Sequence, residues 1–443
     1  MRPPLFLSAV VLLLACTASL GSAPACGSAR PAADGCDGPA RAAHRVSRGE
    51  LPQRFAGFAE EIRSFVKKHR VPGMAVAVSR QGDVVLSRGY GYADTATGEA
   101  VQPTSRFRIA SLSKPITAVA ILQLCEQKQL QLDTPVFSVL DYEAAIAAAG
   151  DDFEPRLRQI TIRHLLQHRG GWDRDASFDA MFQSIRFARQ FGLQPPAGPD
   201  TVIRAMLTQP LDFDPGERYV YSNFGYCLLG RVVEACSGQT YEAYVQDCVL
   251  APLGIDGMQL GATRLAERRP QEVRYYHPGT GRSVFAENLE EPVPHPYGSW
   301  YLEAMDAHGG WIAAAEDLAR FAAAFDAPAN CPILQPASIA AMHRRPPGLA
   351  GHDEAGGPQD VFYSLGWLNR VVGPEKVNHW HTGSLPGTAA IMIRRHDGLN
   401  LIACLNTRIS AAGDDLGGEL DRLLHRAAAR VSTWAAAEEA RGR

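Results

Sequence analysis

Strand-like patterns lie near both ends of this chain, and the long stretch between them is mainly helical in pattern. The first two strand-like runs flank Gln81-Gly82-Asp83, and a polar turn with a central glycine between two apolar runs is typical of a hairpin. Strands near the two ends bury their apolar faces by pairing, so we expect one antiparallel sheet built from both chain ends. The runs are 74–79, 84–87, 377–380, 388–394 and 399–406.

Helical periodicity predicts helices beside this sheet and a second subdomain between its two halves. Apolar residues recur at helical spacing in 55–69, and an Ala/Leu-rich segment at 417–439 closes the chain. The region from 112 to about 330 is mainly helical, with an irregular stretch at 264–301. The sequence therefore predicts an α/β (α+β) fold, an antiparallel sheet flanked by helices plus a mainly helical subdomain. A cleft is expected where the two meet, with 264–301 along one wall.

The chain is close to electrically neutral, which limits the partners it can take. Its 443 residues include 44 Lys and Arg against 47 Asp and Glu, a net charge of −3, and 46% are hydrophobic. This composition gives no basic footprint for nucleic acid. The expected partner is a small-molecule or short-peptide substrate.

The first residues resemble an export signal. Residues 5–15 form an unbroken run of apolar and small residues, too short to span a bilayer. Two processing routes remain open: acylation of Cys16 in the lipobox-like Leu13-Leu14-Ala15-Cys16, or release of a soluble form after Ala23 or Ala25. We expect a periplasmic, secreted or membrane-anchored protein. Its expected parts are a signal (1–25), a linker (26–50), a folded domain (51–432) and a tail (433–443).

The cysteines do not have zinc spacing, and the one pair of histidines that are spaced like zinc ligands lacks the other ligands of such a site. Export places the nine cysteines in an oxidising compartment, and Cys26 and Cys36 could close a small loop. His164 and His168 are four apart, but a nearby Glu and a third ligand are missing, so we interpret them as structural. No metal or cofactor is expected. The other cysteines sit in apolar surroundings and are expected mostly to be packed: Cys125, Cys227, Cys236, Cys248, Cys331 and Cys404.

Ser111 and Lys114 are candidates for nucleophilic chemistry. Pro115 is tolerated only in the first turn of a helix, so it sets the start of a helix near Ser111. Residues three apart share a helix face, and a half-buried lysine can accept a proton from a serine. The pattern is weak alone. Ser111 could simply cap the helix, and a second copy, Ser64 to Lys67, lies mid-helix on a solvated face.

Tyr221 and Asn223 form the second candidate element. Pro215-Gly216 forces a turn, so the segment from Tyr221 to Asn223 is a short extended piece that enters a helix. Residues two apart in an extended chain point the same way, so the phenol and the amide share a surface. A tyrosine near two cations can become acidic enough to act as a base, and an asparagine can hold a substrate carbonyl. The structural alternative is that Ser222 or Asn223 caps the helix and Tyr221 packs.

The third element is His381-Thr382-Gly383-Ser384, which closes a strand-like run. A glycine in a strand lets a ligand approach the backbone closely. The N–H of Ser384 could form an oxyanion hole together with the N–H of Ser111. His381 would supply a hydrogen bond, or a positive charge when protonated; alternatively it is an edge-strand residue before a turn.

In this order, Ser111-x-x-Lys114, Tyr221-x-Asn223 and His381-Thr382-Gly383 resemble the serine β-lactamase and penicillin-binding protein superfamily. The tyrosine version is similar to its class C branch, which includes esterases and D-amino-acid peptidases. The resemblance extends from about residue 55 to about residue 430. Further segments that look like the family are Pro72-Gly73-Met74, 89–94, 160–166 and 309–321.

The resemblance implies a β-lactamase/transpeptidase-like fold and an acyl-enzyme mechanism. Ser111 would attack a carbonyl, and Lys114 and Tyr221 would pass its proton to the leaving group. Asn223 and the 381–384 strand would hold the substrate. The implied activity is that of an exported serine hydrolase acting on an ester or an amide.

Position 381 departs from the family pattern. Antibiotic-hydrolysing members and transpeptidases usually carry lysine where His381 stands, and that lysine helps to hold the substrate carboxylate. Histidine is more typical of esterase-like and aminopeptidase-like members. Asn406 and Arg408 are candidates for another carboxylate contact. Two alternatives remain: a D-Ala-D-Ala carboxypeptidase or β-lactamase, and, in a different class, a non-catalytic penicillin-binding-like sensor or binding lipoprotein.

Overall fold

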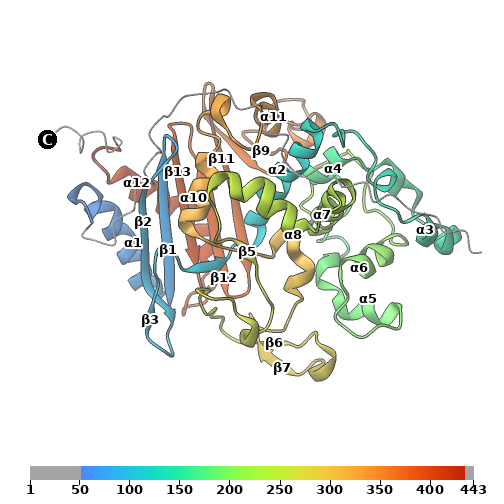
Figure 1. Ribbon diagram of the computed structural model, residues 1–443, viewed down its shortest axis with the longest axis horizontal. Helices are drawn as coiled ribbons and strands as arrows, with labels where there is room; N and C mark the ends of the chain where they lie inside the picture. The colour runs from blue at the N-terminus through green and yellow to red at the C-terminus, as the bar shows by residue number, and fades with distance from the viewer. Residues whose placement is uncertain (1–50, 435–443) are drawn as a thin grey trace, which may run out of the picture. The chain divides into compact units, whose positions relative to one another are not determined.

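The computed structural model describes residues 51–434, and every structural statement below concerns that part of the chain. Its main sheet has eight strands in the order β3-β2-β1-β13-β12-β11-β10-β9, with all neighbours antiparallel (Figure 1). β1 pairs with β13, so strands from the two ends of the chain meet inside the sheet. The strands are β1 (Gly73–Arg80), β2 (Asp83–Asp94), β3 (Glu99–Ala100), β9 (Val361–Tyr363), β10 (Leu368–Gly373), β11 (Lys376–Leu385), β12 (Thr388–Arg394) and β13 (Leu399–Leu405).

Two small sheets and a set of helices complete the described part. β4 (Arg106–Arg108), β8 (Trp311–Ala314) and β5 (Gln259–Leu260) form one small sheet, and β6 (Thr280–Arg282) pairs with β7 (Pro292–Pro294) in the other. The α-helices are α1 (Ala56–His69), α2 (Ser113–Glu126), α3 (Glu143–Ala149), α4 (Ile162–Leu166), α5 (Ser184–Gln190), α6 (Pro199–Met206), α7 (Asn223–Ser237), α8 (Tyr241–Tyr244), α9 (Asp306–Gly309), α10 (Ala315–Ala323), α11 (Pro336–Met342) and α12 (Leu420–Ala429).

Side chains of the main sheet alternate between two cores, because successive residues of a strand point to opposite faces. Met74 and Val76 of β1 pack with apolar residues of α1 and α12, whereas Ala75 and Ala77 face α10 and the helical subdomain. Figure 1 shows α1 and α12 on one side of the sheet and α10 on the other. Because Ala75 and Ala77 have small side chains, α10 can pack closely against this face of the sheet.

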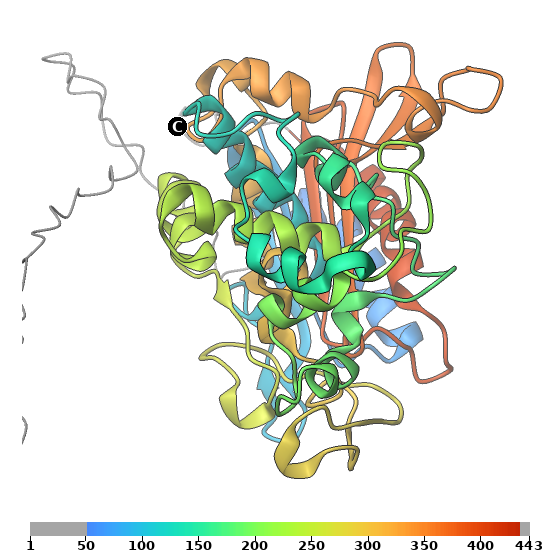
Figure 2. The ribbon, with the colours of Figure 1, turned by 90° about the vertical axis from the view of Figure 1, so that its right-hand side faces the viewer.

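The helix that follows Ser111 runs through the middle of the helical layer. Residues 113–124 of α2 are all buried, as the apolar run around the whole helix predicted, and α2 packs on α7 and α9. In Figure 2 the helical segments of the middle of the chain lie in front of the strands. β10 pairs with β11 only as far as Trp380, so residues 381–385 have one free edge. The short turn Ala110–Leu112 lies beside that part of β11.

The structure confirms the expected sheet, hairpin and terminal helices. The last helix is shorter than predicted, since a 3-10 turn at Leu416–Glu419 precedes it and α12 ends at Ala429. β9 and β10 were not expected. Among the six packed cysteines Cys248 differs, because it is disulfide-bonded. The free thiols in the described residues are Cys125, Cys227, Cys236, Cys331 and Cys404.

Several sequence expectations lie outside the described residues: the signal at 1–25, acylation of Cys16, the linker at 26–50 and the pairing of Cys26 with Cys36. Among the helices of residues 51–434, none combines the length and the apolar character needed to cross a bilayer.

Candidate active site

Ser111 lies in the 3-10 turn Ala110–Leu112, directly before α2. The preceding Ala110 has a φ of 46°, in the left-handed region that residues with a side chain rarely adopt. Such a conformation costs about 1–3 kcal/mol and persists where neighbouring structure imposes it. β11 is one such neighbour, because a Cβ atom on Gly383 would lie 2.0 Å from the carbonyl oxygen of Ile109. The turn that carries Ser111 is thus pressed against the backbone of β11.

Lys114 is fully buried and its amine contacts three groups. Its Nζ atom lies 3.1 Å from Oγ of Ser111, 2.8 Å from Oδ1 of Asn223 and 2.9 Å from the carbonyl oxygen of His308. The i, i+3 spacing places serine and lysine on one face, as predicted.

Burial lowers the pKa of Lys114 well below its usual range. The Asp179 carboxylate raises it and the Arg174 guanidinium lowers it further, both with smaller effects than burial. A neutral amine has two N–H donors and one lone pair. Those two donors match the oxygens of Asn223 and His308, which leaves the lone pair for the hydroxyl proton of the nearby serine.

Tyr221 and Asn223 approach the same serine and lysine from the start of α7. The Tyr221 hydroxyl donates a hydrogen bond to Oγ of Ser111 across 2.7 Å, and Asn223 accepts one from Lys114. The predicted shared surface of phenol and amide is therefore present. Helix capping, the structural role considered for this segment, is found at the residue between them. Oγ of Ser222 caps α7 by accepting a hydrogen bond from the Gly225 N–H at 3.3 Å.

The ionisation of Tyr221 is opposite to the one expected from the sequence. Burial raises its pKa, and the hydrogen bond to Ser111 and the charge of Arg174 lower it by less. The expected acidification assumed two nearby cations, but the Lys114 amine favours its neutral form. At rest Tyr221 is a neutral phenol.

His381 does not offer the positive charge considered above. Its side chain is 2% exposed, and burial together with the nearby Lys114 lowers its pKa to about 3. Nδ1 lies 2.7 Å from the Thr382 carbonyl oxygen, which can only accept, and Nε2 lies 3.0 Å from the Tyr363 hydroxyl. The ring is neutral and both nitrogens are engaged, so His381 is a buried structural link beside the site.

The role expected of Gly383 also changes. Its missing side chain makes room for the Ile109 carbonyl, not for a ligand. Ser384 is exposed and belongs to the part of β11 that has no β10 neighbour, beside the Ser111 turn. The backbone of Ser384 therefore lies in the part of β11 that is next to the turn carrying Ser111.

Four residues near the site were not singled out for this role from the sequence. Oδ2 of Asp179 accepts a 2.6 Å hydrogen bond from Nδ2 of Asn223 and so fixes the orientation of that amide. The ring of His168 lies against that of Tyr221, tilted by 39° with centroids 4.3 Å apart, and its Nδ1 accepts a hydrogen bond from the Ser222 N–H at 3.1 Å. Asp179 belongs to an irregular loop with no sequence pattern to mark it. The other two are Arg174 and Tyr363.

The remaining sequence candidates lie apart from this cluster. Ser64 and Lys67 are exposed on α1, as predicted for a solvated face. His164 closes a capping box at the start of α4, where its Nδ1 accepts a hydrogen bond from the Thr161 N–H at 3.4 Å. Within residues 51–434 no group of His, Cys, Asp and Glu side chains is arranged to hold a metal ion.

The other carboxylate candidates are engaged elsewhere. Arg408 pairs with Asp415 at 2.6 Å, and the buried Asn406 donates to the Tyr92 carbonyl at 3.0 Å. The irregular 264–301 stretch does adjoin the Ser111 turn, because its Trp300 shares an apolar cluster with Ala110 and Leu385.

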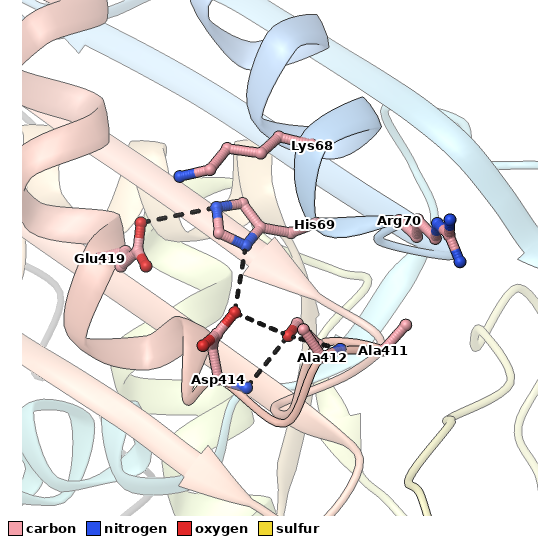
Figure 3. Close-up of a pocket in the computed structure, with 8 residues that line it drawn as sticks. Lys68, His69, Arg70, Ala411, Ala412, Asp414 and Glu419 are labelled. Atoms are coloured by element: carbon pink, nitrogen blue, oxygen red, sulfur yellow. Dashed lines mark hydrogen bonds and ion pairs between the residues drawn. The ribbon is translucent and has the colours of Figure 1, made fainter.

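A separate cavity lies between the end of α1 and the loop before α12. Figure 3 shows the His69 ring there between Glu419 and Asp414, at 3.6 and 3.9 Å. Among its lining residues, Ser410 is the only one with a hydroxyl side chain, and its Oγ donates a hydrogen bond to Oδ2 of Asp414 at 3.1 Å. This cavity does not have the arrangement found around Ser111.

Comparison with known proteins identifies the family. The Beta-lactamase family matches residues 58–426. Penicillin-binding protein 4* of Bacillus subtilis (strain 168) is 27% identical over 345 residues, covering 75% of this chain and 67% of that protein. Esterase EstB of Burkholderia gladioli is 29% identical over 249 residues, covering 53% of this chain and 58% of the esterase.

Solved structures of the same fold include a D-amino acid amidase from Ochrobactrum anthropi SV3 in complex with D-phenylalanine. The TM-score is 0.61 at 22% identity, and the match covers 85% of this chain and 99% of the amidase. The fold is therefore the β-lactamase/transpeptidase-like fold expected from the sequence. Since the family match spans most of the chain, this protein belongs to the β-lactamase family of serine hydrolases.

Proposed function

We propose that this protein is an exported serine hydrolase that cleaves an ester or an amide through an acyl-enzyme at Ser111, as an esterase or a D-amino-acid peptidase does. The main support is that Oγ of Ser111 contacts both Nζ of Lys114 and the hydroxyl of Tyr221. A serine between a desolvated amine and a neutral phenol has a proton acceptor on one side and a donor on the other. Export rests on the apolar run at 5–15.

In acylation, Lys114 acts as the base. The Ser111 hydroxyl passes its proton to the neutral Lys114 amine while Oγ bonds to the substrate carbonyl carbon. The Tyr221 hydroxyl then donates its proton to the departing oxygen or nitrogen and is reprotonated from the lysine. The products are an ester on Ser111 and a free alcohol or amine.

The negative charge that develops on the carbonyl oxygen needs donors, and the N–H groups of Ser111 and Ser384 are the proposed pair. In deacylation a water molecule takes the place of the leaving group, gives a proton to the same Tyr221–Lys114 pair and bonds to the acyl carbon. The bond from that carbon to Oγ of Ser111 then breaks, the pair returns the proton to Oγ, and the carboxylic acid leaves. Asn223 has one N–H of its amide bound to Asp179, and its second N–H remains for a carbonyl of the substrate.

The choice of activity follows from the neutral, fully engaged His381. A lysine at this position would attract a substrate carboxylate to the strand, and His381 cannot do so. Esterase or amidase activity is therefore favoured, and the relative EstB supports it. The relative named a penicillin-binding protein keeps a D-Ala-D-Ala carboxypeptidase or β-lactamase as the second candidate. A purely binding protein is disfavoured because the nucleophile, base and proton donor are all in contact.

A substrate panel tests the proposal with the full chain. The panel contains 4-nitrophenyl butyrate, D-phenylalanine amide, a D-Ala-D-Ala peptide and a chromogenic cephalosporin. We expect turnover of the ester or the amide, lost by about 1,000-fold or more in Ser111→Ala and retained in the control Ser64→Ala. Equal activity in Ser111→Ala would refute the proposal. Stable labelling by a fluorescent penicillin, with hydrolysis of the D-Ala-D-Ala peptide, would favour the second candidate.

Anchoring through Cys16 is part of the proposal on location. Metabolic labelling with a fatty acid tests it: label on the wild type but not on Cys16→Ser indicates a lipoprotein. No label on either, with the protein in the soluble fraction, indicates release as a soluble protein.

A further inference from the structure

His168 is a buried histidine that takes no part in the proton transfers proposed above. It lies in the turn directly after α4, and its side chain is 1% exposed. Its φ of 55° is in the left-handed region, which residues with a side chain seldom adopt. Such a conformation persists where neighbouring contacts impose it. The contacts that His168 makes here are with the segment that carries Tyr221.

The backbone N–H groups on both sides of Tyr221 donate to His168. The Val220 N–H bonds to the carbonyl oxygen of His168 at 2.9 Å, and the Ser222 N–H bonds to Nδ1 of its ring at 3.1 Å. Residues 219–222 belong to no helix or strand, so no regular ladder of hydrogen bonds fixes them. The two bonds to His168 therefore hold this short segment in place.

The His168 ring also packs against aromatic rings of the site. Its centroid lies 4.3 Å from that of Tyr221 and 4.5 Å from that of Tyr363. Burial lowers the pKa of His168 well below its usual range, and the nearby Lys114 lowers it further, so the ring is neutral. Because Nδ1 accepts from Ser222, Nε2 carries the proton, and it has no hydrogen-bond partner within residues 51–434.

Tyr221 can protonate a leaving group only if its hydroxyl stays beside Ser111, where it now lies at 2.7 Å from Oγ. A misplacement of about 1 Å in an active site can cost about 100-fold in rate. We propose that His168 is a positioning residue for Tyr221: its Nδ1 holds the backbone after the tyrosine, and its ring holds the phenol beside Ser111. This inference rests on the proposed function and adds a residue that acts through Tyr221.

The test is the dependence of kcat/KM on the leaving group. The wild type and variants are compared on 4-nitrophenyl butyrate and ethyl butyrate or, for an amidase, on the 4-nitrophenyl ester and the amide of D-phenylalanine. His168→Phe keeps a ring and removes the acceptor. We expect it to slow the substrate with the poor leaving group about tenfold more than the 4-nitrophenyl ester, because only the poor leaving group needs the proton of Tyr221.

Rescue by a conservative variant tests the acceptor itself. His168→Asn removes the ring, supplies an amide oxygen near the place of Nδ1, and tolerates the left-handed φ. It should recover most of the leaving-group-dependent loss seen in His168→Phe. His168→Gly tolerates the same φ and offers no acceptor, so it should not recover that loss.

Combination with Tyr221→Phe separates positioning of the phenol from a general effect on the fold. If His168 acts through Tyr221, His168→Phe should add no further leaving-group dependence in the Tyr221→Phe background. The control is His69→Phe, because His69 is also buried and its ring lies 4.7 Å from that of Phe65, but it belongs to α1. This control should leave the leaving-group dependence unchanged, even where the melting temperature falls.

Equal slowing of both substrates in His168→Phe, or an added leaving-group effect in the Tyr221→Phe background, overturns the inference while Ser111-dependent hydrolysis stands. If His168→Phe does not fold, His168→Asn and His168→Gly supply the comparison, and an equal leaving-group dependence in these two overturns it. Loss of all Ser111-dependent turnover in the wild type would instead overturn the proposed function.

Discussion

The Tyr363 hydroxyl donates a hydrogen bond to Nε2 of His381 across 3.0 Å, and Nδ1 of the same ring donates to the Thr382 carbonyl across 2.7 Å. This pairing fixes one neutral tautomer and leaves no ring nitrogen for a substrate. The His381 ring therefore brings no positive charge to this strand and cannot attract an anionic substrate group.

Buried neutral histidines make stability depend on pH. Burial lowers the pKa of His379 and of His381 to about 3. Below the unfolded-state pKa of about 6.5, the unfolded chain binds protons that the folded chain does not, so stability is lost as the pH falls. Each of the two should cost about 2 kcal/mol between pH 7 and pH 5. Urea unfolding measures the free energy of unfolding at both pH values. Between pH 7 and pH 5, His379→Gln should lose about 2 kcal/mol less of this free energy than the wild type does. An equal loss in the variant and the wild type would contradict this.

Charges beside Lys114 should move the acid limb of the kcat/KM profile in opposite directions. Asp179 raises the pKa of Lys114 and Arg174 lowers it. Asp179→Asn should therefore shift the acid limb to lower pH, and Arg174→Gln should shift it to higher pH. Asp179→Asn should also reduce kcat about tenfold, since Asn223 loses the partner that orients its amide. Profiles that shift the same way in both variants would show that Lys114 is not the titrating base.

Tyr221 should matter most when the leaving group is poor. Because Tyr221 is a neutral proton donor at rest, Tyr221→Phe should scarcely lower kcat/KM for a 4-nitrophenyl ester, since kcat/KM reports acylation and this leaving group needs no proton. An alkyl ester or an amide should be slowed about 100-fold more. Steady-state kinetics over a series of leaving groups measures this. Equal slowing across the series would assign Tyr221 a purely structural role.

Gly383 should be required for the position of the Ser111 turn. A methyl group there would lie 2.0 Å from the Ile109 carbonyl oxygen, so Gly383→Ala must displace the turn from β11. We expect a lower melting temperature and about 100-fold less activity. The control is Gly418→Ala, where no atom lies within 4 Å of the added Cβ. Similar behaviour of the two variants would show that the close approach is not needed.

The part of the site that the sequence predicted is carried by short local patterns. Ser111 and Lys114 lie one helical turn apart, and Tyr221 and Asn223 lie two apart in an extended segment, so their shared faces follow from backbone geometry. The order of strand and helix patterns likewise predicted a sheet built from both chain ends.

What the sequence could not predict depends on contacts between distant segments. Burial and the hydroxyl of Tyr363 decide the ionisation of His381, and neither is visible in the strand that carries it. Asp179 and Arg174 lie in a loop without periodicity, which only the tertiary fold brings to the site. The prediction that Gly383 makes room for a ligand was wrong for the same reason, because the group that lies close to Gly383 is the backbone carbonyl of Ile109, from a distant segment.

The central claim is that Ser111 is the nucleophile, and mapping the site of covalent modification tests it most directly. The full chain is treated with a serine-directed phosphonate ester, digested, and analysed by mass spectrometry. The account predicts one phosphonate adduct on Ser111 that is absent from Ser111→Ala and unchanged in Ser64→Ala. An adduct on another residue, with hydrolysis persisting in Ser111→Ala, would contradict it.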